Sequence, residues 1–154
     1  MISDYIVYLD LPPVPEELLY PIQDIINNPP KPDSKIPASY HYFQTRLVSQ
    51  PLFDWVHDLF KSDCYTQYQI VREGVHIHKD VGRDVAFNYI LQPGGDSVST
   101  NLYDEDQNLI HSEIIQPKRW HRLKTDVYHN VTGMTTDRVA ISTEIFDYKW
   151  GNLL

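Results

Sequence analysis

The sequence predicts a mainly β protein with the double-stranded β-helix, or jelly-roll, architecture and one or two N-terminal helices packed on the larger sheet. From Cys64 onward, apolar and polar residues alternate with the period of two that is typical of strands. Turn-forming clusters at 93–96 and 104–108 separate the alternating runs. The segment before Cys64 instead contains apolar residues at helical spacing, which places the helices ahead of the barrel strands.

The N-terminal part is expected to alternate between strands and helices. A strand is predicted from Tyr5 to Leu11, and the prolines at 12, 13 and 15 end it. Helices are predicted over Glu16–Ile26 and over Leu52–Phe60, and the apolar spacing gives the second helix a buried side of Phe53, Val56, Leu59 and Phe60. Between the helices we expect a stiff, extended connector at Pro29–Asp33 and a strand at Tyr40–Val48.

The C-terminal part is expected to supply the barrel. The alternating runs predict strands at Tyr65–Arg72, Val85–Leu91, Ser97–Tyr103, Leu109–Ile115, Trp120–Leu123, Asp126–Val131 and Val139–Phe146. This is about the strand number of a jelly roll, in which two antiparallel sheets face one another. The helices would then cover apolar side chains on the outer face of the larger sheet.

The size and composition limit what the chain can be. With 154 residues it is predicted to form one domain, residues 1–154. A net charge of −8, from 13 Lys and Arg against 21 Asp and Glu, disfavours nucleic acid and anionic lipid as partners. The single cysteine excludes an internal disulfide. Because we find neither a signal-peptide pattern nor an apolar run of about eighteen residues, we expect a cytoplasmic protein without a membrane span.

The first candidate functional residues lie in the segment His78-Lys79-Asp80, which ends a run of alternating apolar and polar residues. On a strand, residues i and i+2 share a face, so His78 and Asp80 can converge on one point. His129, within the segment 125–131, is our candidate for a third ligand. Two imidazoles and one carboxylate form the facial triad that suits non-heme Fe(II) and leaves coordination positions open. This pattern predicts a catalytic iron centre at His78, Asp80 and His129.

Arg138 is the candidate binding group for an anionic cosubstrate. It opens the apolar, β-branched run 138–143, where a buried guanidinium needs a partner. A planar guanidinium can hold a carboxylate through two parallel hydrogen bonds. We therefore expect a cosubstrate acid to bind at Arg138.

The segments GVHIHKDVGRDVAFNYIL and TDVYHNVTGMTTDRVAIS resemble the Fe(II)/2-oxoglutarate-dependent oxygenases, and most of all their small prolyl-hydroxylase-like and aspartyl/asparaginyl-hydroxylase-like members. The resemblance runs from about residue 65 to residue 146. It implies that His78, Asp80 and His129 hold Fe(II) and that Arg138 binds the far carboxylate of 2-oxoglutarate. It also implies a dioxygenase that hydroxylates a peptidyl or free amino acid or a small metabolite, with ascorbate as an optional reductant.

Further residues are candidates for the 2-oxoglutarate pocket. Tyr68 and Ser142 carry hydroxyls, which commonly share an anion with Arg, and Asn88 could hydrogen-bond the cosubstrate. Asn88 and Tyr89 are neighbours on one predicted strand, so only one of them can face the barrel interior. Arg83 is either a surface charge paired with the aspartate that follows it or a binding group for an acidic substrate.

Alternatives stay open for both the ligands and the function. A pair of His76 and His78 would suit a cupin-like metal enzyme that does not use 2-oxoglutarate, and His121 competes with His129 as the distal ligand. A jelly roll could equally be a non-catalytic binding module, since fold does not determine function. The triad residues could also be unrelated polar groups at loop ends. An oxygenase differs from a binding module in one observable, the Fe(II)-dependent conversion of 2-oxoglutarate to succinate.

Overall fold

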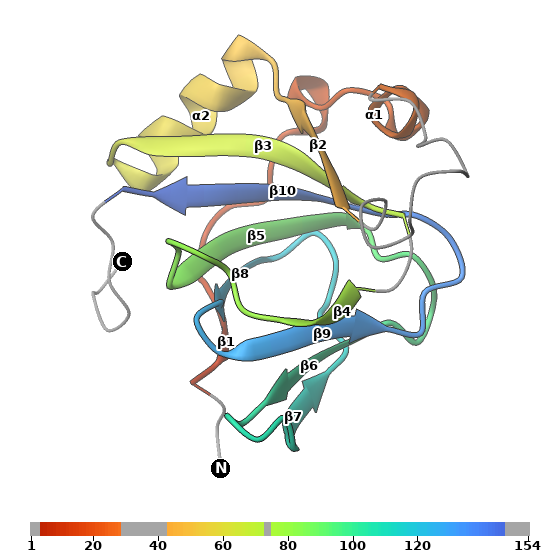
Figure 1. Ribbon diagram of the computed structural model, residues 1–154. Coiled ribbons are helices and arrows are strands. Elements are labelled where there is room, and N and C mark those ends of the chain that lie inside the picture. The colour runs from red at the N-terminus through yellow and green to blue at the C-terminus, as the bar shows by residue number, and fades with distance from the viewer. Residues whose placement is uncertain (1–3, 29–42, 73–74, 147–154) are drawn as a thin grey trace.

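The computed structural model describes residues 4–28, 43–72 and 75–146. The described chain forms two antiparallel sheets that face one another, with the helices outside the larger sheet (Figure 1). The larger, six-stranded sheet contains, in spatial order, β1 (Ile6–Tyr8), β8 (Trp120–Lys124), β5 (Val85–Gln92), β10 (Arg138–Ile145), β3 (Cys64–Val71) and β2 (Phe43–Leu47). The smaller, four-stranded sheet contains β4 (Val75–His78), β9 (Tyr128–Thr132), β6 (Ser99–Tyr103) and β7 (Leu109–Glu113).

The path of the chain defines a double-stranded β-helix, which confirms the predicted fold class. From β3 to β6 successive strands belong alternately to the larger and the smaller sheet, and after the β6–β7 hairpin the alternation resumes from β8 to β10. The predicted barrel strands agree closely with β3 and with β5 to β10. The small-sheet pair β4 and β9 therefore lies across the barrel from the large-sheet strands β5 and β10.

Helix α2 (Gln50–Phe60) begins two residues before its predicted start. Ser49 precedes it, and the Ser49 hydroxyl accepts a hydrogen bond from the Leu52 backbone nitrogen at 3.3 Å, which is the usual role of a serine N-cap. The buried face consists of Leu52, Val56 and Phe60. Phe53, predicted to be buried, is only half-buried because the helix turns Leu52 toward the sheet instead.

The single helix predicted over Glu16–Ile26 is wrong. The segment forms a 3-10 turn, η1 (Glu16–Leu18), and a short helix, α1 (Ile22–Asn27). Pro21 separates them, because proline has no N–H to continue a helix and its ring disfavours helical backbone in the residue before it. The connector Pro29–Asp33 and the first residues of the strand predicted from Tyr40 lie outside the described residues. None of the described helices has the length and hydropathy needed to cross a bilayer.

The two faces of the larger sheet have different environments. Side chains on the outer face pack with α1 and α2 in one apolar cluster, which includes Tyr68, Ile70, Phe87, Tyr89, Trp120 and Ile141. Side chains on the inner face meet the smaller sheet in a second cluster, which includes Ile90, Leu102, Leu123 and Ala140. Because strand side chains alternate, the residues between the outer-face positions project into the barrel.

The connection between β9 and β10 is held in a tight conformation. Gly133 has a φ of +86°, and a Cβ atom at this position would lie 2.5 Å from the carbonyl oxygen of Ser97. The backbone nitrogens of Thr135 and Thr136 both donate to the carbonyl oxygen of Gly94, at 2.8 and 3.0 Å. These contacts fix the point at which β10 begins.

Candidate metal centre

Three donor side chains converge inside the barrel, from β4 and from β9. His78 is the last residue of β4 and lies directly opposite His129 on β9. Asp80 follows β4 and points to the same side of the strand as His78, as the spacing of two predicts. One potential ligand atom from each residue lies within 4.8 Å of the others. The structure thus brings together His78, Asp80 and His129 as the sequence predicts.

Each histidine is oriented by its own strand. The Nδ1 atom of His78 lies 2.8 Å from the carbonyl oxygen of His76, and Nδ1 of His129 lies 2.7 Å from that of Val127. A carbonyl oxygen can only accept, so each Nδ1 carries the proton and donates it. The Nε2 atoms then face the common centre, where each lies 3.4 Å from Oδ1 of Asp80. Metal-binding histidines typically have this arrangement, in which one ring nitrogen donates its proton to a carbonyl oxygen and the other ring nitrogen faces the metal.

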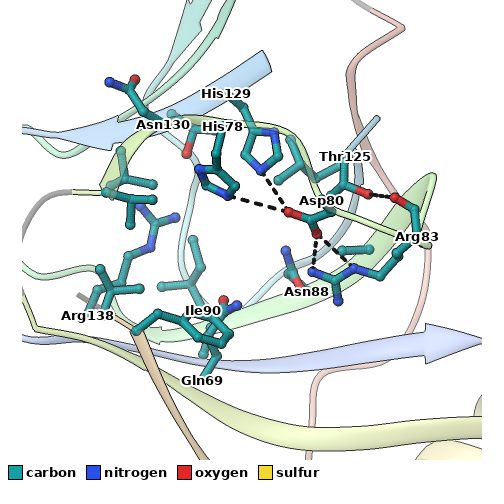
Figure 2. A pocket seen from close by; sticks show the side chains of 18 of the residues that line it. Gln69, His78, Asp80, Arg83, Asn88, Ile90, Thr125, His129, Asn130 and Arg138 are labelled. Carbon is teal, nitrogen blue, oxygen red and sulfur yellow. Dashed lines mark hydrogen bonds and ion pairs between the residues drawn. The ribbon is translucent and has the colours of Figure 1, made fainter. Parts of the chain in front are cut away.

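The Asp80 carboxylate divides its two oxygens between different partners. Oδ1 faces the two histidines, whereas Oδ2 accepts hydrogen bonds from Nε and Nη2 of Arg83 at 2.9 and 2.5 Å (Figure 2). Burial opposes ionisation of Asp80, but the hydrogen bonds from His129 and His78 and the charge of Arg83 outweigh it and hold the pKa of this carboxyl well below its ordinary value. The hydrogen bond with Asp80 raises the pKa of His78 above its ordinary value. Asp80 is therefore an anion that offers one free oxygen to the centre.

The loop that carries Arg83 is fixed by Thr125. The backbone nitrogen of Asp80 donates to the Thr125 carbonyl at 2.9 Å, and the Thr125 hydroxyl donates to the Arg83 carbonyl at 2.8 Å. The predicted pairing of Arg83 with Asp84 is wrong, because the guanidinium pairs with Asp80 instead, and its alternative role as a binding group for an acidic substrate stays a prediction. The turn between Asp80 and Arg83 directs the guanidinium back onto Asp80.

The centre opens into a cavity of about 400 Å³ between the two sheets. Arg138 and Arg83 lie at opposite ends of it, with the three donor residues between them (Figure 2). The middle of the cavity is lined partly by apolar side chains such as Ile90 and Ala140.

Arg138 lines the cavity as a buried cation. It is 8% exposed, and none of the described residues forms an ion pair or hydrogen bond with its side chain. Burial lowers the pKa of Arg138 to about 10, so the guanidinium keeps its charge at neutral pH. Its place is set by Asp137, whose carboxylate accepts from Arg72 at 3.2 Å and whose carbonyl accepts from Gln92 at 2.7 Å. Arg138 is thus a positioned cation without an anionic partner in the described part of the chain, as a cosubstrate site requires.

The other predicted cosubstrate residues differ in their positions. Asn88 lines the cavity, and its Oδ1 is buried without a hydrogen-bond partner among the described residues, whereas Tyr89 packs on the helix side. Ser142 is buried on the inner face of β10, with its hydroxyl 3.4 Å from Nη1 of Arg83. Tyr68 corrects the prediction: it projects to the outer face, where its hydroxyl accepts from the Tyr20 backbone nitrogen at 3.1 Å. Gln67 and Gln69 face the cavity in its place.

The alternative histidines are not part of the convergent donor set. His76 is exposed and contributes its backbone carbonyl, which orients His78. His121 is fully buried on β8 and lines the cavity from the opposite sheet. Burial lowers the pKa of His121 to about 4, so the ring is neutral at physiological pH. Among the described residues, the group able to hold a metal consists of His78, Asp80 and His129.

Sequence reasoning did not single out Gln67, Gln69 or Glu144, which also line the cavity. Two signals could have found them. The glutamines alternate with buried apolar residues on β3, and Glu144 is an acid within the otherwise uncharged stretch 139–145. Both patterns mark polar side chains on the inner face of strands with a buried outer face.

The donor set fits a divalent transition metal. Two neutral imidazole nitrogens and one carboxylate oxygen converge from one side, which is the arrangement of the facial triad of non-heme Fe(II) sites. The geometry therefore defines a double-stranded β-helix with a candidate His-x-Asp…His metal centre and a buried arginine in the same cavity.

Comparison with known proteins gives structural likeness at low identity. No protein-family model matches the chain, and no curated protein sequence matches it. Among solved structures, it is similar to a 2OG-Fe(II) oxygenase family oxidoreductase from Burkholderia pseudomallei, with 9% identity, a TM-score of 0.43, and coverage of 62% of this chain and 51% of that one. It is also similar to a Pseudomonas putida prolyl-4-hydroxylase (13%, TM-score 0.45, 67% of each chain) and to IDO from Bacillus thuringiensis (13%, TM-score 0.42, 63% and 58%). The match thus spans about half of the first of these proteins.

Proposed function

We propose that this protein is an Fe(II)- and 2-oxoglutarate-dependent dioxygenase. One observation carries the proposal: a His/Asp/His donor set and a buried arginine without an anionic partner among the described residues line the same cavity. The donor set accounts for the metal, and the arginine accounts for a carboxylate-bearing cosubstrate. A non-catalytic metal-binding module would require only the first of these features.

His78, Asp80 and His129 would hold Fe(II), and Arg138 would bind the distal carboxylate of 2-oxoglutarate. When bound, the iron and the cosubstrate supply the oxidative chemistry, in which dioxygen and 2-oxoglutarate yield succinate and carbon dioxide and one oxygen atom enters a substrate C–H bond. The protein's residues bind and orient the reactants and exclude water.

Three contacts prepare the cavity for this role. The backbone carbonyls behind His78 and His129 orient both rings so that their Nε2 atoms are directed at the proposed metal position. Arg83 holds Oδ2 of Asp80 and thereby leaves Oδ1 as the single donor oxygen. The unpartnered Oδ1 of Asn88 is available to accept a hydrogen bond from a bound reactant.

The test is succinate formation by the purified protein. Wild type and Asp80→Ala are incubated with Fe(II), ascorbate, 2-oxoglutarate and air, first alone and then with candidate peptides, amino acids and small metabolites. We expect slow succinate formation by the wild type and only background formation by Asp80→Ala. The matched control is Asp84→Ala, which removes an exposed carboxylate from the same loop and should retain the wild-type rate.

Failure of the wild type to form succinate, with iron shown to be bound, would reject the oxygenase and favour a metal-binding module. A metal that is retained after loss of Asp80 and released after loss of His76 would instead favour the cupin-like alternative.

A further inference from the structure

The cavity contains a carboxylate that the proposed metal and cosubstrate do not use. Glu144 lies on β10, an interior strand of the larger sheet, and lines the cavity. It is half-buried, and no hydrogen bond or ion pair joins its side chain to another described residue. A half-buried carboxylate that lines a cavity and has no cation among the described residues is available to pair with a cationic group of a ligand.

Strand geometry places Glu144 at the end of the cavity opposite Arg138. The two residues are six positions apart on β10, so they share its inner face and are separated by about 20 Å along the strand. Ser142 lies between them and contacts Arg83, which marks the Arg83 side of the metal centre. The cavity thus has a cation at one end and an anion at the other.

The arginine at this end of the cavity, Arg83, does not neutralise Glu144. Arg83 places two of its nitrogens on Oδ2 of Asp80, so its charge is already matched. Gln67 extends the same polar surface from β3, opposite Ser142 of β10, whereas Gln69 lies opposite Ala140 and nearer to Arg138. No hydrogen bonds join these amides to other described side chains. The carboxylate of Glu144 and the amide oxygen of Gln67 form an acceptor surface suited to N–H donors.

We infer that this end of the cavity binds the prime substrate and that the substrate presents a cationic nitrogen group, an ammonium or a guanidinium, to Glu144. The inference rests on the function proposed above, because that function assigns the Arg138 end to 2-oxoglutarate and leaves the Glu144 end to the substrate. The expected substrate class is therefore a basic amino acid, free or within a peptide, or a small amine.

The experiment compares cations with neutral counterparts of similar shape. Wild type loaded with Fe(II) and 2-oxoglutarate without oxygen is titrated calorimetrically with L-arginine against L-citrulline and with L-lysine against L-norleucine. We expect each cation to bind at least about tenfold more tightly than its counterpart, as for a hydrogen-bonded ion pair that is partly withdrawn from water. Glu144→Gln should abolish this preference. Glu113→Gln, which changes a half-buried glutamate outside the cavity, should retain it.

A wild type that binds neither cation more tightly than its counterpart overturns the inference, and so does a Glu144→Gln protein that keeps the preference. Thermal unfolding of each variant shows whether it is folded, and Glu144→Asp, which keeps the charge, should retain part of the preference. If the wild type forms succinate but shows no preference for cations, this inference alone is rejected and the proposed function stands. A Glu144-dependent preference in a protein that does not bind 2-oxoglutarate would reject the proposed function alone.

Discussion

Replacing Arg138 by methionine is expected to stabilise the ligand-free protein while removing the proposed cosubstrate site. Arg138 is 8% exposed and has no anionic partner among the described residues. Burial lowers its pKa from 12.5 to about 10. This shift corresponds to a cost of about 3 kcal/mol for keeping the side chain charged in the folded protein. Methionine is unbranched and apolar and can occupy much of the same volume. The free energy of unfolding of Arg138→Met should therefore exceed that of wild type by up to about 3 kcal/mol.

The same substitution should weaken 2-oxoglutarate binding by at least about a hundredfold, because it removes a charge-assisted pair of hydrogen bonds. Stability is measured by urea unfolding of protein free of metal and cosubstrate. Affinity is measured by calorimetric titration of metal-loaded protein with 2-oxoglutarate. Arg119→Met removes an exposed arginine and serves as the control, with little expected change in the affinity.

The combination of the two measurements decides the interpretation. If Arg138→Met unfolds more readily than wild type and binds 2-oxoglutarate equally well, the arginine has a structural role and the reasoning is refuted. Arg138→Lys should recover the affinity only in part, because an ammonium lacks the planar pair of donors.

Three further predictions concern the surroundings of the centre. Burial lowers the pKa of His121 to about 4. Below about pH 6.5 this side chain is therefore protonated in the unfolded chain but stays neutral in the folded protein, so the free energy of unfolding falls as the pH is lowered. Between pH 7 and pH 5, the free energy of unfolding of His121→Gln, measured with urea, should fall by about 2 kcal/mol less than that of wild type. An equal fall in the two proteins would contradict the lowered pKa of His121. Arg83→Gln should lower affinity for Co(II), a spectroscopic substitute for Fe(II), by about tenfold or more, since the Asp80 carboxylate loses two hydrogen bonds; unchanged affinity would show that Asp80 needs no support from this side chain. Gly133→Ala should lower the free energy of unfolding by about 1 to 3 kcal/mol, because its φ is +86° and its Cβ would contact the Ser97 carbonyl; an unchanged midpoint of thermal unfolding would mean that this turn relaxes freely.

Much of the fold could be predicted from the pattern of apolar and polar residues within single segments of the sequence. Alternation with a period of two depends only on residues within one strand, and it located the barrel strands from β5 to β10 closely. The convergence of His78 and Asp80 was accessible for the same reason, since both lie on one short stretch of chain. The interrupted helix near Pro21 was a missed local signal, because the apolar spacing was given more weight than the proline.

The residues that were misplaced depend on information that a local pattern does not contain. Alternation shows that Tyr68 and its neighbours Gln67 and Gln69 lie on opposite faces of β3, but it does not show which face meets the helices. Tyr68 was assigned to the wrong face for this reason. The pairing of Arg83 with Asp80 likewise depends on how a turn folds back, which is fixed by contacts with Thr125 more than forty residues away.

The way the imidazoles of His78 and His129 are aligned affects how the candidate metal centre can change over evolutionary time. Each ring is held by a main-chain carbonyl two residues before it, at His76 and Val127. A main-chain carbonyl is present whatever side chain occupies the position, so its alignment of the ring survives substitution as long as the strand keeps its path. The proposed substrate end of the cavity can therefore diversify through Gln67 and Glu144 without a compensating change at either imidazole. Short segments around 76–80 and 127–129 would carry this alignment with them into another barrel that pairs the same two strands.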